Sequence, residues 1–400
     1  MELNLGYKQT EAGVIPEEWQ ISYVGVEFDI KLGKMLDAEK NIGVPKLYLG
    51  NRAVQWGKID ISDLASVRLS HSDLSRFRLK KGDLLVCEGG EVGRAAIWEA
   101  PLPECYYQKA LHRLRPIKKY DPLLMLYVLM YWSDRGKLTN YVTQTSIAHL
   151  TREKFEVVPL LLPPLPEQRA IAAALSDMDA LLAAQDQLIA KKRDIKQAVM
   201  QQLLTGKQRL AGFSGEWEVK RVDEIAAINM GQSPNSANYN RRGKGISLIQ
   251  GNADIENRET VQRVWTTQIT KQCDKGDLIL TVRAPVGAVA IVSEPSCLGR
   301  GVCSLKAVDT DQRFLFYTLV FNESAWKVLE QGSTFTSANS AQVASFSVPI
   351  APRIEEQTAI AAVLSDMDAE IDALQQRRDK TQMLKQGMMQ ELLTGRTRLV

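Results

Sequence analysis

The chain has 400 residues, of which 45% are hydrophobic and 24% are charged, an ordinary composition for a globular protein of two or three domains. There is no run of about 18 apolar residues and the N-terminal stretch lacks an apolar signal core, so we expect neither a membrane span nor export. The formal net charge of +3 neither requires nor excludes a nucleic-acid partner, so any basic surface has to arise by folding.

Cysteine usage points to a reducing compartment. The chain has five cysteines, an odd number, and none is in CxxC spacing. This pattern argues against a disulfide framework and against a zinc site. We therefore expect a cytoplasmic protein without a bound metal.

Residues 1–160 predict a first globular domain with a small sheet. Short β-favouring runs, LLVCE (84–88) and AAIW (95–98), lie between Gly, Asp and Pro turn signals. Tyr120–Trp132 has the pattern of an amphipathic helix, and Trp19 is expected in the core. The domain is therefore predicted to be α+β.

Residues 161–210 predict one long helix. A proline-containing run precedes it and a glycine follows its last leucines, which sets a start and a stop. From Glu167 to Leu204 the helix has 38 residues, or about 57 Å. Its apolar positions step by four and three, which predicts a coiled-coil seam. The seam is Ile171, Leu175, Met178, Leu182, Gln185 and Ile189, followed by an expected phase slip to Ile195 and Val199.

Residues 211–350 predict a second α+β domain, and residues 351–400 predict a second long helix. The stretch Pro352–Leu399 repeats Pro163–Leu210 at a constant offset of 189 residues, with EQ, AIAA, LSDMDA and LLTG nearly identical. The domain again has β-favouring runs and an amphipathic pattern, at Phe314–Trp326. The second seam is Ile360, Leu364, Met367, Ile371, Leu374 and Arg378, followed by an expected slip to Leu384 and Met388.

The repeat extends into the domains. YLGN (48–51) matches IQGN (249–252), and VGRAAI (92–97) matches VGAVAI (286–291). The order is therefore domain, helix, domain, helix, and we predict a pseudo-twofold repeat whose two helices form an antiparallel coiled coil. The alternative, in which each helix packs only on its own domain, is less favoured because 38 residues overrun a compact domain. The repeat also continues from the C-terminus into the N-terminus, so residue 400 is expected near residue 1.

No catalytic constellation stands out. The three histidines, His71, His112 and His149, all lie in the first domain, and the sequence has no GxxxxGK[ST] phosphate loop. GGEVG (89–93) is interpreted as a turn. The paired aspartates of the repeated SDMDA are two residues apart, so they diverge around a helix and are expected on a solvated face. These absences disfavour an enzyme.

Two domains alike in framework and different between their anchors suit recognition of two different targets. Candidate readers are polar, long or planar side chains in glycine-rich loops, because Arg and Lys bridge guanine edges and Asn and Gln bridge adenine edges. Others would hold phosphates. In the first domain they are Asn51, Arg52, Gln55, Arg94, Gln108, Lys109, Gln144, Ser146 and His149. In the second they are Gln232, Ser233, Asn235, Tyr239, Asn252, Arg283, Arg300, Thr334, Ser337 and Asn339.

These motifs together resemble a known family, the DNA-sequence specificity subunits of Type I restriction-modification systems. The resemblance is carried by the start GYKQTEAGVIPEEW, by the junctions PPLPEQRAIAAAL and PRIEEQTAIAAVL, and by the helix ends QQLLTGKQRL and QELLTGRTRL. It covers essentially the whole chain. The second junction departs from the pattern, since RIEEQ stands where LPEQ would be.

The resemblance implies a division of labour. Each domain would be a target recognition domain that reads one half of a bipartite, asymmetric sequence in double-stranded DNA, and the two helices would set the spacing. Two methyltransferase subunits, with S-adenosylmethionine, would dock on the repeated regions, and restriction subunits that translocate DNA with ATP would join them. The specificity subunit itself would bind no cofactor and carry no catalytic residue.

Two other classes remain open from the sequence. One is a scaffold that binds proteins on two similar domains without touching DNA. The other is a nuclease or methyltransferase with an unfamiliar site. Salt-dependent gel shifts with and without methyltransferase subunits discriminate the first, because phosphate binding weakens with salt. An assay of the isolated chain with S-adenosylmethionine discriminates the second.

The helix lengths generate the first prediction. Dyad-related DNA readers favour half-sites about 34–36 Å apart, and a helix pair near 57 Å with a domain at each end spans such a distance. Adding one heptad to both helices is expected to lengthen the nonspecific spacer of the DNA target. The measurement is a map of methylated sites, and an unchanged spacer would refute the ruler.

Overall fold

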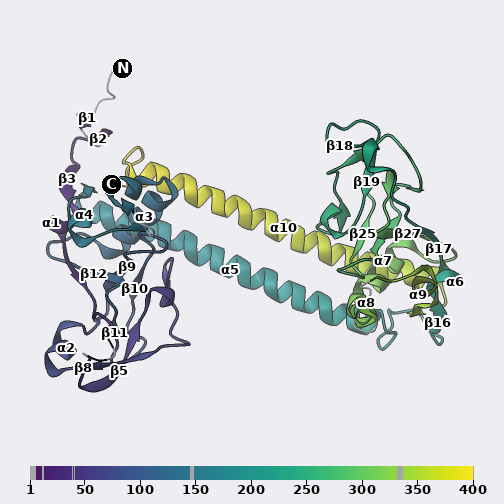
Figure 1. Ribbon diagram of the computed structural model, residues 1–400, viewed down its shortest axis with the longest axis horizontal. Coiled ribbons are helices and arrows are strands. Elements are labelled where there is room, and N and C mark those ends of the chain that lie inside the picture. Colours follow the sequence, from purple (N-terminus) through teal and green to yellow (C-terminus); the bar gives the residue numbers. More distant parts are fainter. Residues whose placement is uncertain are drawn as a thin grey trace. The chain divides into compact units, whose positions relative to one another are not determined.

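A computed structural model of the protein describes residues 6–10, 13–37, 39, 41–144, 148–330 and 337–399 (Figure 1). The chain divides into two compact units. Unit 1 contains Met1–Gln185 and Arg377–Val400, and unit 2 contains Asp186–Gln376. Each unit therefore takes part of each long helix.

Unit 1 is built on a four-stranded antiparallel sheet and a smaller three-stranded sheet. The larger sheet has the order β10-β9-β12-β4. Its strands are β4 (Phe28–Leu32), β9 (Asp83–Cys87), β10 (Ala95–Trp98) and β12 (Leu111–Pro116). The smaller sheet has the order β11-β5-β8, formed by β5 (Val44–Leu49), β8 (Ser66–Leu69) and β11 (Tyr106–Tyr107). The remaining pairs are β1 (Tyr7–Thr10) with β2 (Gly13–Pro16), β3 (Gln20–Tyr23) with β15 (Pro159–Leu162), β6 (Val54–Gln55) with β7 (Lys58–Ile59), and β13 (Thr143–Gln144) with β14 (Ala148–His149).

Unit 2 repeats the four-stranded part of this arrangement and extends it, with six strands in its larger sheet and five in its second sheet. Its larger sheet has the order β17-β27-β24-β25-β21-β20, so β25, β24, β27 and β17 correspond to β10, β9, β12 and β4. The strands are β17 (Ala226–Met230), β20 (Ile255–Glu256), β21 (Glu259–Thr260), β24 (Leu278–Thr281), β25 (Val289–Ile291) and β27 (Val302–Ala307). The second sheet contains β18 (Tyr239–Asn240), β19 (Ile246–Ile249), β22 (Trp265–Thr266), β23 (Gln272–Cys273) and β26 (Ser296–Leu298), and β16 (Glu218–Arg221) pairs with β28 (Ser347–Ile350). This confirms the predicted α+β internal repeat.

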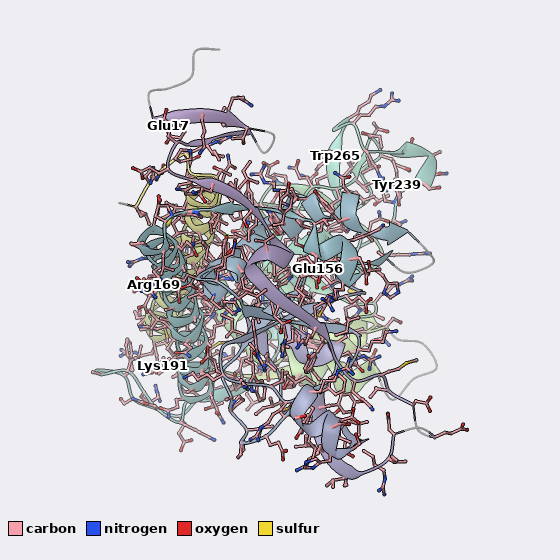
Figure 2. The ribbon with its side chains drawn as sticks, turned by 90° about the vertical axis from the view of Figure 1, so that its left-hand side faces the viewer. Glu17, Glu156, Arg169, Lys191, Tyr239 and Trp265 are labelled. Atoms are coloured by element: carbon pink, nitrogen blue, oxygen red, sulfur yellow. The ribbon has the colours of Figure 1, made fainter. Side chains whose placement is uncertain are left out.

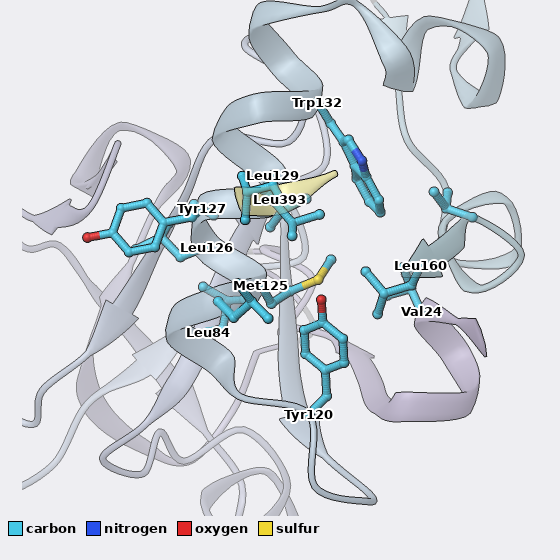
Figure 3. Packing of buried hydrophobic residues seen from close by; sticks show 14 of the residues in the cluster. Val24, Leu84, Tyr120, Met125, Leu126, Tyr127, Leu129, Trp132, Leu160 and Leu393 are labelled. Carbon is cyan, nitrogen blue, oxygen red and sulfur yellow. The ribbon is translucent and has the colours of Figure 1, made fainter. Parts of the chain in front are cut away.

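The expected amphipathic helices turn out to be buried on nearly all sides. In α3 (Pro122–Asp134), every residue from Leu124 to Leu129 is buried, because the helix is enclosed between the sheet and the long helices in one core cluster (Figure 3). In unit 2 the expected helix is divided at Asn322 into α7 (Gln312–Phe321) and α8 (Glu323–Glu330). The amphipathic prediction was therefore wrong for α3 and α7, whereas α8 has Trp326 buried and Ser324 and Ala325 exposed. The other helical segments are α1 (Val24–Glu27), α2 (His71–Arg76), α4 (Arg152–Glu156), α6 (Val222–Ile225), α9 (Ser340–Ser345) and the 3-10 turns η1 (Asn51–Ala53), η2 (Lys137–Tyr141), η3 (Ser236–Asn238) and η4 (Asn252–Asp254).

The two long helices are α5 (Leu165–Leu203) and α10 (Ile354–Leu393), drawn in teal and yellow in Figure 1. They run antiparallel, since residue numbers rise along α5 as they fall along α10. In unit 1, Gln185 Nε2 donates to Thr381 Oγ1 at 3.2 Å. In unit 2, Lys192 and Glu370 form an ion pair at 2.6 Å. The helices therefore pack on each other as well as on the domain cores, as predicted. Within the described residues no helix is both long and apolar enough to cross a membrane.

The apolar seam lies where the heptad pattern placed it. Ile171, Leu175, Leu182, Ile189, Ile360, Leu364 and Ile371 are buried, while Met178, Met367 and Leu374 are half-buried. The predicted phase slip was wrong. Ile195 is 41% exposed and Leu384 is 59% exposed. The heptad instead continues in phase through Lys196 and Lys385, whose long aliphatic stems can be buried.

Each of these lysines belongs to a duplicated group of three side chains. In unit 1, Lys385 Nζ lies 2.5 Å from Asp179 Oδ1 and 5.3 Å from the centre of the Tyr127 ring. The Tyr127 hydroxyl donates to Asp179 Oδ2 at 2.8 Å, and Figure 3 shows this ring pointing away from Met125 and Trp132. Burial together with the neighbouring carboxylate raises the pKa of Tyr127. Asp179 is therefore an ion-pair partner at the seam, which corrects the solvated role expected for it.

Unit 2 repeats the group with Lys196, Asp368 and Tyr317. The Tyr317 hydroxyl donates to Asp368 Oδ2 at 2.8 Å, and Lys196 pairs with the other carboxylate oxygen. Lys196 Nζ also lies 5.2 Å from the centre of the Tyr317 ring. In contrast, Asp177 and Asp366 are exposed, as predicted. The LSDMDA repeat therefore contains one seam aspartate and one solvent aspartate in each copy.

The repeated EQ motif closes each unit. Glu167 and Glu356 are 1% and 0% exposed, and each accepts two hydrogen bonds from an arginine that follows the end of the other helix. Arg398 reaches Glu167 at 2.6 and 2.9 Å, and Arg209 reaches Glu356 at 2.5 and 2.6 Å. In unit 1, Trp19 Nε1 adds a third donor to Glu167 at 2.8 Å, which confirms its core position.

The glutamine of the same motif joins the long helix to the preceding domain helix. Gln168 Oε1 accepts from the backbone of Asp121, the residue that caps α3, and Gln168 Nε2 donates to Pro163 O, each at 2.9 Å. Gln357 makes the equivalent pair of bonds to Asp311 N and Ala351 O, each at 2.8 Å. The two letters EQ thus fix where each long helix begins relative to its unit.

The described ends of the chain meet in unit 1. The Tyr7 hydroxyl donates to the carbonyl of Gly395 at 3.0 Å, and Arg398 donates to Glu18 at 2.8 Å. These contacts agree with the circular character of the repeat. Met1 and Val400 themselves lie outside the described residues.

The closing arginine generates a stability prediction. Arg398→Ala would leave the buried Glu167 carboxylate with only the indole donor, and breaking a buried ion pair typically costs about 3–5 kcal/mol. We expect the free energy of unfolding in urea to fall by about 3 kcal/mol. Arg396→Ala is the matched control, because the Arg396 side chain is 61% exposed and its Nη1 lies 3.7 Å from Glu391 Oε1. Equal effects of the two changes would refute the closing role.

Candidate nucleic-acid interface

A turn after the central strand forms the core of the candidate interface in both units. It covers residues 88–93 in unit 1 and 282–287 in unit 2. Cys87 N donates to Arg94 O at 2.8 Å, and Thr281 N donates to Ala288 O at 2.9 Å. Gly93 and Gly287, which have φ of 85° and 96°, close the two turns. The hydrogen bonds that frame the turn are therefore the same in both units, while the residues inside it differ, with Gly90 at φ 76° in unit 1 and a cis peptide bond between Ala284 and Pro285 in unit 2.

In unit 1 the turn is filled by the protein's own side chains. Asn51 Nδ2 donates to Gly89 O at 2.8 Å. Arg94 donates from Nη2 to Asn51 O at 3.0 Å and from Nη1 to Glu91 at 3.1 Å. The Arg94 side chain is only 15% exposed. Asn51 and Arg94 therefore hold the loops together, and either would have to exchange these bonds to contact a base.

Unit 2 has an open groove beside its turn, and Ala288 stands where unit 1 has Arg94. The groove has a volume of about 830 Å³. Asn252, the equivalent of Asn51, is exposed on its wall. The groove is lined by Arg241, Gln250, Gly251, Asn252, Ala253, Asp254, Arg263, Val264, Ala284 and Pro285.

The electrostatics of the groove follow from how Asp254 is used. This aspartate is 5% exposed, and its carboxylate accepts from the backbone N–H groups of Gln250 and Gly251 at 2.7 and 3.2 Å. Arg263 donates to Ala253 O at 2.8 Å, which fixes it on the rim. The acid is thus occupied by backbone donors while Arg241 and Arg263 line the opening. Guanidinium groups beside free amides suit phosphates and base edges.

The other predicted readers of unit 1 are arranged around the same loops. His149 lies against Gly89, and Gln108 lies against Gly50. Arg52, Gln55 and Lys109 are exposed. Ser146 is outside the described residues, and the side chain of Gln144 is not described.

Several predicted readers of unit 2 have local structural contacts. Ser233 Oγ accepts from Arg300 N at 3.0 Å, and the Tyr239 hydroxyl donates to Pro234 O at 3.0 Å. Asn235 and Asn339 each cap a helical turn. Gln232, Arg283, Arg300 and Ser337 are exposed, and Thr334 is outside the described residues. Base contact by any predicted reader stays a prediction.

The sequence reasoning missed the basic residues of the groove. Arg241, Arg242 and Lys244 are exposed in the turn between β18 and β19, and Arg263 precedes β22. Figure 2 labels Tyr239 on β18, which leads into this turn, and Trp265 on β22, which pairs with β18. The string NRRGKG (240–245) was the available signal, since three cations around two glycines mark an exposed basic turn.

The cysteines and His112, whose side chains are of types that commonly serve catalysis, are buried or bonded to the backbone. Within the described residues no cluster of His, Cys, Asp and Glu is able to hold a metal ion. All five cysteines are free and buried, and burial raises the pKa of Cys105 to about 11 and of Cys273 to about 12. Burial also lowers the pKa of His112, whose Nε2 lies 2.7 Å from Leu150 O.

Comparison with known proteins assigns the chain. Residues 16–191 and 214–382 both match the Type I restriction modification DNA specificity domain. The chain belongs to this family. Two similar proteins are both from Methanocaldococcus jannaschii. The putative type I restriction enzyme MjaX specificity subunit is 29% identical over 98% of this chain and 97% of its own length. The type I restriction enzyme MjaVIII specificity subunit is 24% identical over 98% and 96%.

Solved structures agree with this family in fold. A chain from a type I restriction-modification system, solved for its complex assembly and conformational transition, has a TM-score of 0.68 at 23% identity and covers 96% of this chain and 99% of its own. The specificity subunit HsdS from Thermoanaerobacter tengcongensis has a TM-score of 0.53 at 21% identity, with coverages of 96% and 98%. The family resemblance seen in the sequence is therefore confirmed.

The filled turn of unit 1 gives a prediction. Arg94→Ala removes the bonds to Asn51 and Glu91, and we expect the free energy of unfolding to fall by about 1–2 kcal/mol. Arg52→Ala is the control on the same loop, because Arg52 is exposed. Urea denaturation measures both. If Arg94→Ala is as stable as Arg52→Ala, the guanidinium does not hold the loops.

Proposed function

We propose that this chain is the DNA-recognising specificity subunit of a Type I restriction-modification complex. Each unit reads one half of a bipartite, asymmetric sequence in double-stranded DNA. Two methyltransferase subunits, which use S-adenosylmethionine, and restriction subunits, which use ATP, dock on the chain and act where it binds. The chain itself is non-catalytic and binds no cofactor.

The observation that carries the proposal is the pairing of a repeated backbone with unlike turns. One specificity-domain match begins in each unit, and the larger sheets of the two units share four strands in the same order. At the equivalent turn, one unit has a filled surface with Asn51 and Arg94, and the other has a groove with Asn252 and two arginines. Unlike surfaces on like frames suit an asymmetric target. The buried thiols and the absence of a metal cluster within the described residues favour a binding role over a catalytic one.

The test is performed on the full chain with its methyltransferase subunits. We expect a host that carries the complex to acquire methylation at one bipartite motif, detected by mapping modified bases across the genome. The chain without methyltransferase subunits should leave the host unmodified. A complex that assembles but modifies no motif would support the protein scaffold instead.

Gel shifts at several salt concentrations test the groove. Arg241→Ala and Arg263→Ala are each expected to weaken DNA binding and to reduce the slope of log affinity against log salt by about 1, because each removes one cation beside a phosphate. Arg313→Ala, an exposed arginine on α7, is the matched control and should keep the slope. An unchanged slope in both groove variants would place DNA elsewhere.

A further inference from the structure

A second contact is repeated at the candidate interface. Gly89 pairs with His149 in an isolated antiparallel bridge in unit 1, and Arg283 pairs with Ser337 in the same kind of bridge in unit 2. The neighbouring hydrogen bonds also match, since Leu150 N donates to Glu88 O at 2.8 Å. In unit 2, Ala338 N donates to Val282 O at 2.8 Å. The two bridges are therefore the same structural position.

The side chains at this position have reciprocal sizes. In unit 1 the turn supplies glycine and the facing strand supplies histidine. A Cβ added to Gly89 would lie 2.9 Å from His149 Nδ1, closer than real Cβ atoms approach, and 3.1 Å from its Cε1, so the imidazole would have to shift. In unit 2 the turn supplies the large side chain, Arg283, and the facing residue is the small Ser337. Each bridge thus has one large polar side chain, which comes from the facing strand in unit 1 and from the turn in unit 2.

The surroundings fix the backbone at the bridge in both units. In unit 1, the buried His112 contacts Leu150 O at 2.7 Å, next to His149, while Asn51 anchors the carbonyl of Gly89 at 2.8 Å. In unit 2, Val282 N donates to Gly301 O at 2.9 Å. Arg283 is exposed and directly precedes Ala284, which lines the basic groove. Polar side chains on a fixed backbone are suited to reading base edges.

We propose that this bridge is the specificity-determining position of each unit, occupied by His149 in unit 1 and by Arg283 in unit 2. The inference rests on the proposed function and names the residues that distinguish the two half-sites. Arg283 takes a guanine, because its planar fork matches the O6 and N7 acceptors of that base. His149 makes a single hydrogen bond to a base edge, since an imidazole offers one ring nitrogen at a time in one direction.

The first experiment removes the fork from unit 2. Arg283→Ala in the complex with methyltransferase subunits should reduce discrimination at one guanine position by about 5- to 150-fold. The mapped motif should become degenerate there and remain unchanged in the other half-site. Arg283→Lys keeps the charge but loses the two parallel bonds, so we expect it to be degenerate at the same position. Arg313→Ala is the matched control, with an unchanged motif.

The second experiment transfers the unit 2 pair into unit 1. Gly89→Arg alone should lower the melting temperature, because the new Cβ meets His149. The double change Gly89→Arg with His149→Ser should restore it and should give a new base preference in the half-site of unit 1 only. His149→Ser alone should fold and relax one position of that half-site.

The outcomes separate this inference from the function on which it rests. If the unchanged complex modifies no bipartite motif, the proposed function fails. If it does, and Arg283→Ala, Arg283→Lys and His149→Ser all retain the original motif with undiminished discrimination, the bridge does not determine specificity. Should the double variant fail to fold, these three single changes decide the question alone.

Discussion

The buried ion pair between a helix start and the end of the other helix is the constraint on which each unit depends. A carboxylate removed from water costs several kcal/mol unless a cation and further donors meet it. Glu167 and Glu356 are removed from water almost completely, and their arginines come from the far end of the sequence repeat. Each unit therefore needs the C-terminal end of the helix that begins in the other unit to form its buried ion pair. In unit 1 the same helix end also places Leu392 and Leu393 in the hydrophobic core.

The seam adds register to this closure. A coiled coil with only apolar residues can slide by a heptad, whereas a polar residue at a seam position selects one alignment. Lys385 is 7% exposed and faces Asp179, so a shift of seven residues would leave a buried cation without its carboxylate partner. Tyr127 ties the same carboxylate to α3 and thereby links helix alignment to the domain core. The equivalent group in unit 2 acts in the same way through Tyr317.

The sequence predicted what was periodic or repeated and missed what depends on distant partners. The steps from Ile171 to Ile189 gave the correct seam because every position except Gln185 is apolar. The pattern failed at Ile195 because apolarity was taken to mark the seam, whereas Lys196 occupies it with an aspartate from the other helix. The helix at Tyr120–Trp132 was expected to show one polar face. Enclosure on several sides is a tertiary property that periodicity does not report.

The candidate readers show the same limit more sharply. Asn51 and Asn252 stand in the same GN motif, yet one is bonded into a filled turn and the other lines an open groove. In unit 1 the bond to the Asn51 carbonyl comes from Arg94, which is distant in sequence, and Ala288 stands in its place in unit 2. A local motif therefore places a reader on the surface but does not say whether its hydrogen bonds are free.

The near-neutral net charge is compatible with a basic groove because several carboxylates face the interior of the fold. Net charge counts each Asp and Glu equally, but a carboxylate that accepts from backbone N–H groups is turned away from solvent and from ligands. Asp254 does this beneath the groove of unit 2, while Arg241 and Arg263 line its opening. Glu167 and Glu356 are likewise buried inside the fold. A chain with a formal charge of only +3 can thus present a locally basic groove, because folding sorts its acids inward at the positions where cations are needed.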